Sequence, residues 1–119
     1  MQTTVPENLL IVTATSTTLS TYIDLSGKTL EALVFPDIDG TAVTFQAALP
    51  NTQGNSQIPS STWLPIVNSA GTAYQLTIAD NTWQVVDHDV FVGVRWLRLV
   101  FGTVQTGNRT ITAMVSRDR

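Results

Sequence analysis

The sequence predicts an all-β protein, an antiparallel β-sandwich that is jelly-roll-like and has eight or nine short strands. Three observations lead to this fold class. Threonine, valine and isoleucine number 19, 13 and 7 in 119 residues, and β-branched residues favour strands over helices. Turn-forming residues recur roughly every 10 residues, a spacing typical of sandwiches and barrels. No apolar period of 3.6 residues is sustained along the chain, which argues against long amphipathic helices.

The first half of the chain divides into four expected strands. Residues 8–15 and 18–25 carry alternating aliphatic and β-branched side chains, and a Ser-Gly turn follows the second of them. Residues 29–35 are an apolar run that ends before a loop of Pro, Asp and Gly. Residues 42–49 place Val, Phe, Ala and Leu on one face, so we expect a strand with one side in the core.

The second half begins with a long polar segment. Residues 50–62 hold mainly Pro, Asn, Gln, Ser and Thr, which predicts a surface loop. A proline interrupts residues 63–67, as is typical of an edge strand. Residues 73–79 alternate well, residues 83–86 are a short strand, and residues 109–116 close the fold.

Residues 90–102, VFVGVRWLRLVFG, are expected to form one long strand with two apolar faces. A half-exposed antiparallel strand would alternate apolar and polar residues instead. A second sheet, a long loop or another subunit must therefore cover the second face. Arg95 shares its face with Phe91, Leu97 and Leu99, and a charge on an apolar face needs a partner. We therefore interpret Arg95 as an interface arginine.

The length predicts a single domain over residues 8–119, preceded by an extended arm over residues 1–7. The proline at position 6 keeps the preceding residue out of the helical region. We expect the arm to extend onto a partner surface and to become ordered there. The candidate interface residues are Val5, Pro6, Phe91, Arg95, Leu97 and Leu99.

Composition excludes several partners. Charged residues make up 13% of the chain, about half of the typical value of roughly 25%. A net charge of −3 with six basic residues argues against direct nucleic-acid binding and against binding an anionic membrane. We expect no signal peptide and no membrane span. The absence of cysteine excludes disulfides, thiolate metal sites and a cysteine nucleophile.

Two clusters resemble chemical sites, and we expect both to be structural. Asp87, His88 and Asp89 place an imidazole between carboxylates, but adjacent strand residues point apart and the chain has one histidine. Residues 37–40, DIDG, match the start of a calcium loop, but Ala48 stands where that loop needs its last glutamate. The sequence therefore predicts no enzyme, no catalytic residue, no metal and no cofactor.

Four aromatic residues offer an alternative as a sugar-stacking platform. They are Trp63, Trp83, Tyr22 and Tyr74. Aromatic rings supply large rigid contact surfaces when exposed. The opposing interpretation is that the two tryptophans fill the ends of the core. Exposed coplanar rings would favour a carbohydrate-binding module with a glycan partner, and buried rings would favour a structural protein.

Five segments of the chain together resemble a group of small structural proteins of tailed bacteriophages. They are residues 33–36, 44–46, 63–72, 95–103 and 109–112, within a region of resemblance over residues 29–116. The shared features are an apolar-Pro strand, a T-F-Q strand, an aliphatic strand before a Gly-Thr turn, a W-L-R-L strand and an R-T-I-T closing strand. These are strand patterns and turns, so the resemblance carries over no catalytic residue.

The resemblance implies a capsid decoration (cement) protein, or a head or tail accessory protein, with a jelly-roll-like fold. Such a protein is expected on the capsid surface of the virion, as a homotrimer that bridges neighbouring major capsid proteins. It would stabilise the shell against the pressure of packaged DNA, since binding the assembled state stabilises that state. The alternatives are a tail, baseplate or fibre component and, from the aromatic residues, a carbohydrate-binding module.

Overall fold

The computed structural model describes residues 4–13, 17–50 and 58–118. It confirms the all-β prediction, since these residues form an antiparallel β-sandwich of nine strands and one 3-10 helix. The strands are β1 (Thr4–Thr13), β2 (Ile23–Asp24), β3 (Lys28–Phe35), β4 (Ala42–Pro50), β5 (Pro59–Pro65), β6 (Gln75–Thr77), β7 (Thr82–Val85), β8 (Trp96–Phe101) and β9 (Arg109–Asp118). The helix is η1 (His88–Phe91).

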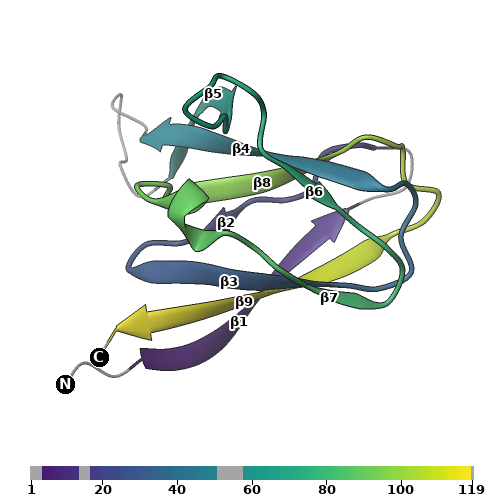
Figure 1. Ribbon diagram of the computed structural model, residues 1–119, viewed down its shortest axis with the longest axis horizontal. Helices are drawn as coiled ribbons and strands as arrows, with labels where there is room; N and C mark the ends of the chain where they lie inside the picture. Colours follow the sequence, from purple (N-terminus) through teal and green to yellow (C-terminus); the bar gives the residue numbers. More distant parts are fainter. Residues whose placement is uncertain (1–3, 14–16, 51–57, 119) are drawn as a thin grey trace.

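Two sheets form the layers of the sandwich (Figure 1). The first sheet has the strand order β1-β9-β3-β7. The second has the order β2-β8-β4-β5, with β6 paired to β4 beside this path. Strands far apart in the sequence thus become neighbours, and β1 pairs with β9 along its whole length. Thr4 and Asp118, the first and last residues that the structure describes, lie opposite each other at one end of this pair (Figure 1).

The core lies between the sheets and follows from the two-residue period of each strand. On β9, Ile111, Ala113 and Val115 are buried, while the residues between them are at least partly exposed. On β4, Val43 and Phe45 are buried in the same way. The largest fully buried apolar side chains are Trp96, Phe35, Phe45, Phe101, Ile11, Leu30, Leu33, Leu97, Leu99, Ile111 and Val43.

The prediction of one long strand over residues 90–102 is wrong in its first half. Asp87 begins a helical turn there, since its Oδ1 accepts a hydrogen bond of 3.2 Å from the backbone N–H of Asp89. Gly93 then takes a left-handed conformation with φ +83°, which suits glycine. A side-chain cap and a left-handed glycine outweigh the β-propensity of the valines here, so β8 begins only at Trp96.

The chain itself covers much of both faces of β8. Leu97 and Leu99 are buried between the two sheets, and Phe91 is buried at the end of η1. The prediction that Phe91, Leu97 and Leu99 form an interface is therefore corrected, because all three side chains are buried in the core, where the rings of Phe45 and Tyr74 contact Phe91. Trp96 is buried as well, and the guanidinium of Arg95 lies 4.4 Å from the centre of its ring.

The expected arm over residues 1–7 is also corrected in part. Residues 4–7 belong to β1 because β9 offers an antiparallel partner as far as Thr4, which pairs with Asp118. Residues 1–3 lie outside the described residues. Pro6 lies opposite Ser116 and is exposed. Its missing N–H is tolerated because β1 is an edge strand.

Two further boundaries differ from the sequence-based expectation. The expected strand over residues 18–25 is reduced to β2, because the preceding segment forms bridges to both sheets. Ser20 pairs with Thr13 of β1, and Leu19 pairs with Val100 of β8. A segment that crosses between sheets forms no regular ladder in either of them. Strand β5 starts at Pro59, inside the stretch expected to be a loop, of which residues 51–57 lie outside the described residues.

Candidate interaction surfaces

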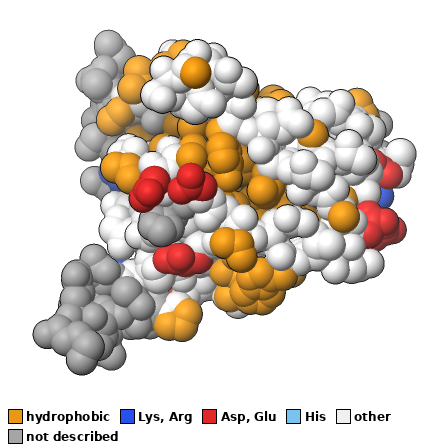
Figure 2. Space-filling model, in the orientation of Figure 1, with side chains coloured by type: hydrophobic (Ala, Val, Ile, Leu, Met, Phe, Trp, Pro, Cys, Tyr) orange, Lys and Arg blue, Asp and Glu red, His pale blue; other side chains and the backbone are white. Residues whose placement is uncertain are grey.

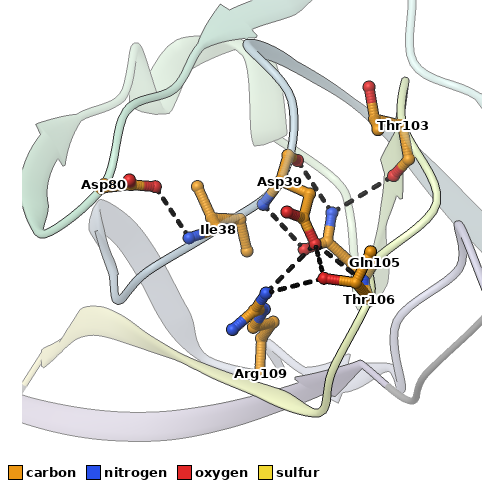
Figure 3. A network of polar contacts seen from close by, with 7 residues as sticks. All are labelled: Ile38, Asp39, Asp80, Thr103, Gln105, Thr106 and Arg109. Atoms are coloured by element: carbon orange, nitrogen blue, oxygen red, sulfur yellow. Dashed lines mark hydrogen bonds and ion pairs between the residues drawn. The ribbon is translucent and has the colours of Figure 1, made fainter.

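One end of the sandwich is held by a polar network around Asp39 and Gln105 (Figure 3). The side-chain amide of Gln105 is fully buried. Its Oε1 accepts a hydrogen bond of 3.0 Å from the N–H of Asp39, and its Nε2 donates to the carbonyls of Asp39 at 2.9 Å and Thr103 at 3.2 Å. The carboxylate of Asp39 accepts from the N–H and hydroxyl of Thr106 and from Arg109.

These bonds explain the DIDG motif as a structural loop. The N–H and hydroxyl of Thr106, followed by the Arg109 guanidinium, hold the pKa of Asp39 below its ordinary value. The carboxylate is thus engaged by donors of its own chain, the Arg109 guanidinium among them. Among the described residues, no three His, Asp or Glu side chains are grouped so that they could hold a metal ion.

Asp87 and Asp89 lie at the start of η1 rather than in an open loop. Asp87 caps this helix with its carboxylate, and its own N–H donates to the Tyr74 hydroxyl at 3.3 Å. The side chain of His88 lies outside the described residues. The first carboxylate of this motif therefore serves as the N-cap of η1.

The four aromatic residues do not form one platform. Trp63 of β5 lies in the second sheet, and Trp83 of β7 lies in the first. Tyr74 packs against Phe45 and Phe91, with ring centres 5.6 Å and 5.8 Å apart. Tyr22 alone joins Trp63, at 5.9 Å. The coplanar exposed rings that would favour a carbohydrate-binding module are therefore not present in this set.

The outward side of the first sheet carries apolar side chains from all four strands, and those on β1 and β7 are exposed. Leu10 pairs with Thr112, Thr112 with Val34, and Val34 with Trp83. Leu10 and Trp83 are each 61% exposed, and Val85 is 75% exposed. We call this surface the apolar face. It consists of Leu10, Val12, Val34, Trp83, Val85 and Met114.

Charge is sparse around the apolar face. Among the described residues that point outward from this sheet, Glu31 carries the charge, and its carboxylate accepts a hydrogen bond from Ser116 at the border. In Figure 2 a cluster of hydrophobic side chains lies at the lower margin of the view, where Figure 1 places β7. An apolar surface with few charges around it suits contact with another protein.

The outward side of the second sheet carries a different set of side chains. The guanidinium of Arg98 lies 4.3 Å from the centre of the Trp63 ring, and its Nε donates to Oε1 of Gln46 at 2.8 Å. Tyr22 completes the group and is 47% exposed. We call these four residues, Tyr22, Gln46, Trp63 and Arg98, the arginine–aromatic cluster. They come from the segment before β2 and from β4, β5 and β8.

Arg95, the expected interface arginine, is half-buried and paired within the chain. Its Nε lies 3.3 Å from Oδ1 of Asp24, and its Nη2 lies 3.4 Å from Oδ2. Burial alone would raise the pKa of Asp24, but the Ser26 N–H and Arg95 outweigh it, so the pKa is lowered. Beside this pair, a groove of about 510 Å³ runs between the turns at Gly27 and Gly93.

Of the six candidate interface residues, the structure brings Phe91, Leu97 and Leu99 into the interior and leaves Pro6 and part of Arg95 accessible. The side chain of Val5 lies outside the described residues. The apolar face was not predicted from the sequence, although the sequence contains a signal for it. Residues 9–12 read LLIV, which makes both sides of β1 apolar, and Leu10 and Val12 on one of those sides are exposed.

Comparison of the chain with protein-family models, with curated proteins and with solved structures finds no match. In the part of the chain that the structure describes, no helix has the length and apolar character needed to span a membrane.

Proposed function

We propose that this chain is a non-enzymatic virion structural protein, a capsid decoration protein that binds the outside of the head shell as an oligomer and bridges major capsid proteins. The apolar face is the observation that carries this proposal. Trp83 is 61% exposed, which corresponds to roughly 150 Å² of side-chain surface. Covering that surface with a partner protein contributes about 4 kcal/mol, at about 25 cal/mol per Å². A surface that gains this much from being covered favours a protein that functions when bound to another.

The strand order supports the jelly-roll part of the proposal. If β6 is set aside, eight strands remain, and the first of them pairs with the last. Strands from both halves of the chain then interleave in each sheet, as in the two Greek keys of a jelly roll. This is the fold that the resemblance to phage structural proteins implies, and jelly rolls are common in viral capsid proteins.

The polar groups of the fold support a structural role as well. Asp39, Asp87 and Arg109, which are among the more reactive residue types of the chain, are engaged in capping or in holding loops together. These side chains therefore stabilise the fold itself. A decoration protein needs a rigid scaffold that presents surfaces, and this arrangement supplies one.

The test is to add the purified chain to capsids assembled from the major capsid protein encoded in the same genome. We expect saturable co-sedimentation with the capsids, and light scattering of the free protein at three times 12.9 kDa. Replacement of both Trp83 and Val85 by threonine should lower the affinity at least tenfold. The control Val92→Thr changes another highly exposed valine outside the apolar face and should bind as the wild type does.

Capsids that bind none of the purified chain would contradict the proposal. Binding to purified tails in place of capsids would contradict the capsid assignment and would favour a tail, baseplate or fibre component. Unchanged affinity in the Trp83 and Val85 double variant would show that the apolar face is not the docking surface.

A further inference from the structure

Arg98 differs from the other arginines whose side chains the structure describes. Each of the other three forms an ion pair with a carboxylate of the chain: Arg95 with Asp24, Arg109 with Asp39 and Arg117 with Glu7. Arg98 forms no such pair among the described residues and donates instead to the neutral amide of Gln46. A charged guanidinium that has no carboxylate partner within its own chain can pair with a carboxylate of another molecule.

The surroundings of Arg98 hold its guanidinium in a fixed position. Gln46 lies directly across the β4–β8 ladder from Arg98 and accepts from Nε, which leaves the two Nη groups of the fork for a ligand. The ring of Trp63 supports the flat side of the group at 4.3 Å. Partial burial lowers the pKa of Arg98, as expected for a cation that has lost water without gaining an anion.

The composition of the cluster indicates a protein ligand. Tryptophan, tyrosine and arginine are the residues most enriched at the energetic centres of protein interfaces. A sugar would need an open aromatic face, whereas the guanidinium of Arg98 already occupies one side of Trp63 and Tyr22 lies beside it. The remaining chemistry is a planar donor fork, which fits a carboxylate in two-point contact.

We infer that the arginine–aromatic cluster is a recognition site for a carboxylate of a partner protein, an Asp or Glu side chain that pairs with the Nη groups of Arg98. This inference deepens the proposed function, since it gives the chemistry of one contact with the docked protein. It concerns the outward side of the second sheet, whereas the apolar face lies on the first, so the chain would present two different surfaces to its neighbours.

The test uses the purified full chain and a small dicarboxylate, so it does not depend on capsids. Glutarate is titrated at constant ionic strength while the Arg98 Nε–H and the Trp63 indole N–H are followed by NMR. We expect saturable shifts confined to the cluster. Glutaramide, which has the same shape without charge, should bind at least tenfold more weakly. Linear shifts, or equal effects of glutarate and glutaramide, would overturn the inference.

Two variants sharpen this result. Arg98→Gln should weaken glutarate binding at least tenfold, and Arg98→Lys should weaken it as well, because an ammonium lacks the planar fork. Arg117→Gln removes an exposed arginine of the first sheet and should leave the titration unchanged. Equal binding by Arg98→Gln and wild type would overturn the inference. If an Arg98 variant fails to fold, the comparison of glutarate with glutaramide on the wild-type protein is sufficient to test the inference.

Discussion

Replacement of Gln105 by methionine tests whether the polar network holds the end of the sandwich together. Gln105 is fully buried, and its amide makes three hydrogen bonds to backbone groups of Asp39 and Thr103. Methionine has a similar length and fits a buried position, so the change removes the amide with little change of volume.

The size of the effect follows from those three bonds. Each contributes about 1 kcal/mol net, and the backbone groups left behind keep no partner from the new side chain. We therefore expect Gln105→Met to lower the free energy of unfolding by about 3 kcal/mol. Because the slope for a small protein in urea is about 1–3 kcal/mol per M, the midpoint should fall by roughly 1–3 M.

Urea unfolding at 25 °C, followed by tryptophan fluorescence, measures this loss. Gln75→Met is the matched control, since Gln75 is an exposed residue of β6. Exposed substitutions of this kind change stability by about 0.5 kcal/mol or less. A loss for Gln105→Met no larger than that of the control would refute the view that the network is a structural clamp.

Two further predictions concern the same end of the fold. The Thr106 N–H and hydroxyl, with Arg109, hold the pKa of Asp39 below its ordinary value, so its contribution to stability is present above that ordinary value and is lost as pH falls through the folded value. The stability difference between wild type and Asp39→Asn, measured by urea midpoints, should shrink on acidification, and a constant difference would contradict this. Gly40→Ala should destabilise more than Gly27→Ala in thermal unfolding. Both glycines have positive φ, but a Cβ at Gly40 would lie 2.9 Å from the Cβ of Thr103 and one at Gly27 meets nothing within 4 Å. Equal losses of stability in the two variants would show that Thr103 moves away from the new Cβ at no cost.

The strands with complete alternation were predictable from the sequence, and those set by tertiary pairing were not. β4 lies within a residue of its expected bounds because its apolar residues alternate, and β3 does so because turn residues bound its apolar run. The prediction of a strand in the segment before β8 is wrong, because a helix cap at Asp87 and the left-handed conformation of Gly93 determine the structure there. β1 extends to Thr4 because β9 pairs with it, which no local pattern of the N-terminal residues indicates.

The candidate surfaces were predictable to different degrees. The apolar face has a local signal, since residues 9–12 are apolar on both sides of the strand. The arginine–aromatic cluster has none, because its residues meet only through the register of three strands. Ala48 pairs with both Trp63 and Trp96, and this register brings Trp63 toward Arg98. Trp63 and Arg98 are 35 positions apart in the sequence, and they meet because both of their strands pair with β4.

Cryo-electron microscopy of capsids incubated with this chain would show whether and how it binds the shell. We expect density for the β-sandwich on the outer surface of the shell, with Trp83 and Val85 of the apolar face buried against a neighbouring protein. Capsids without such density, or density in which the apolar face remains open to solvent, would contradict the proposed function.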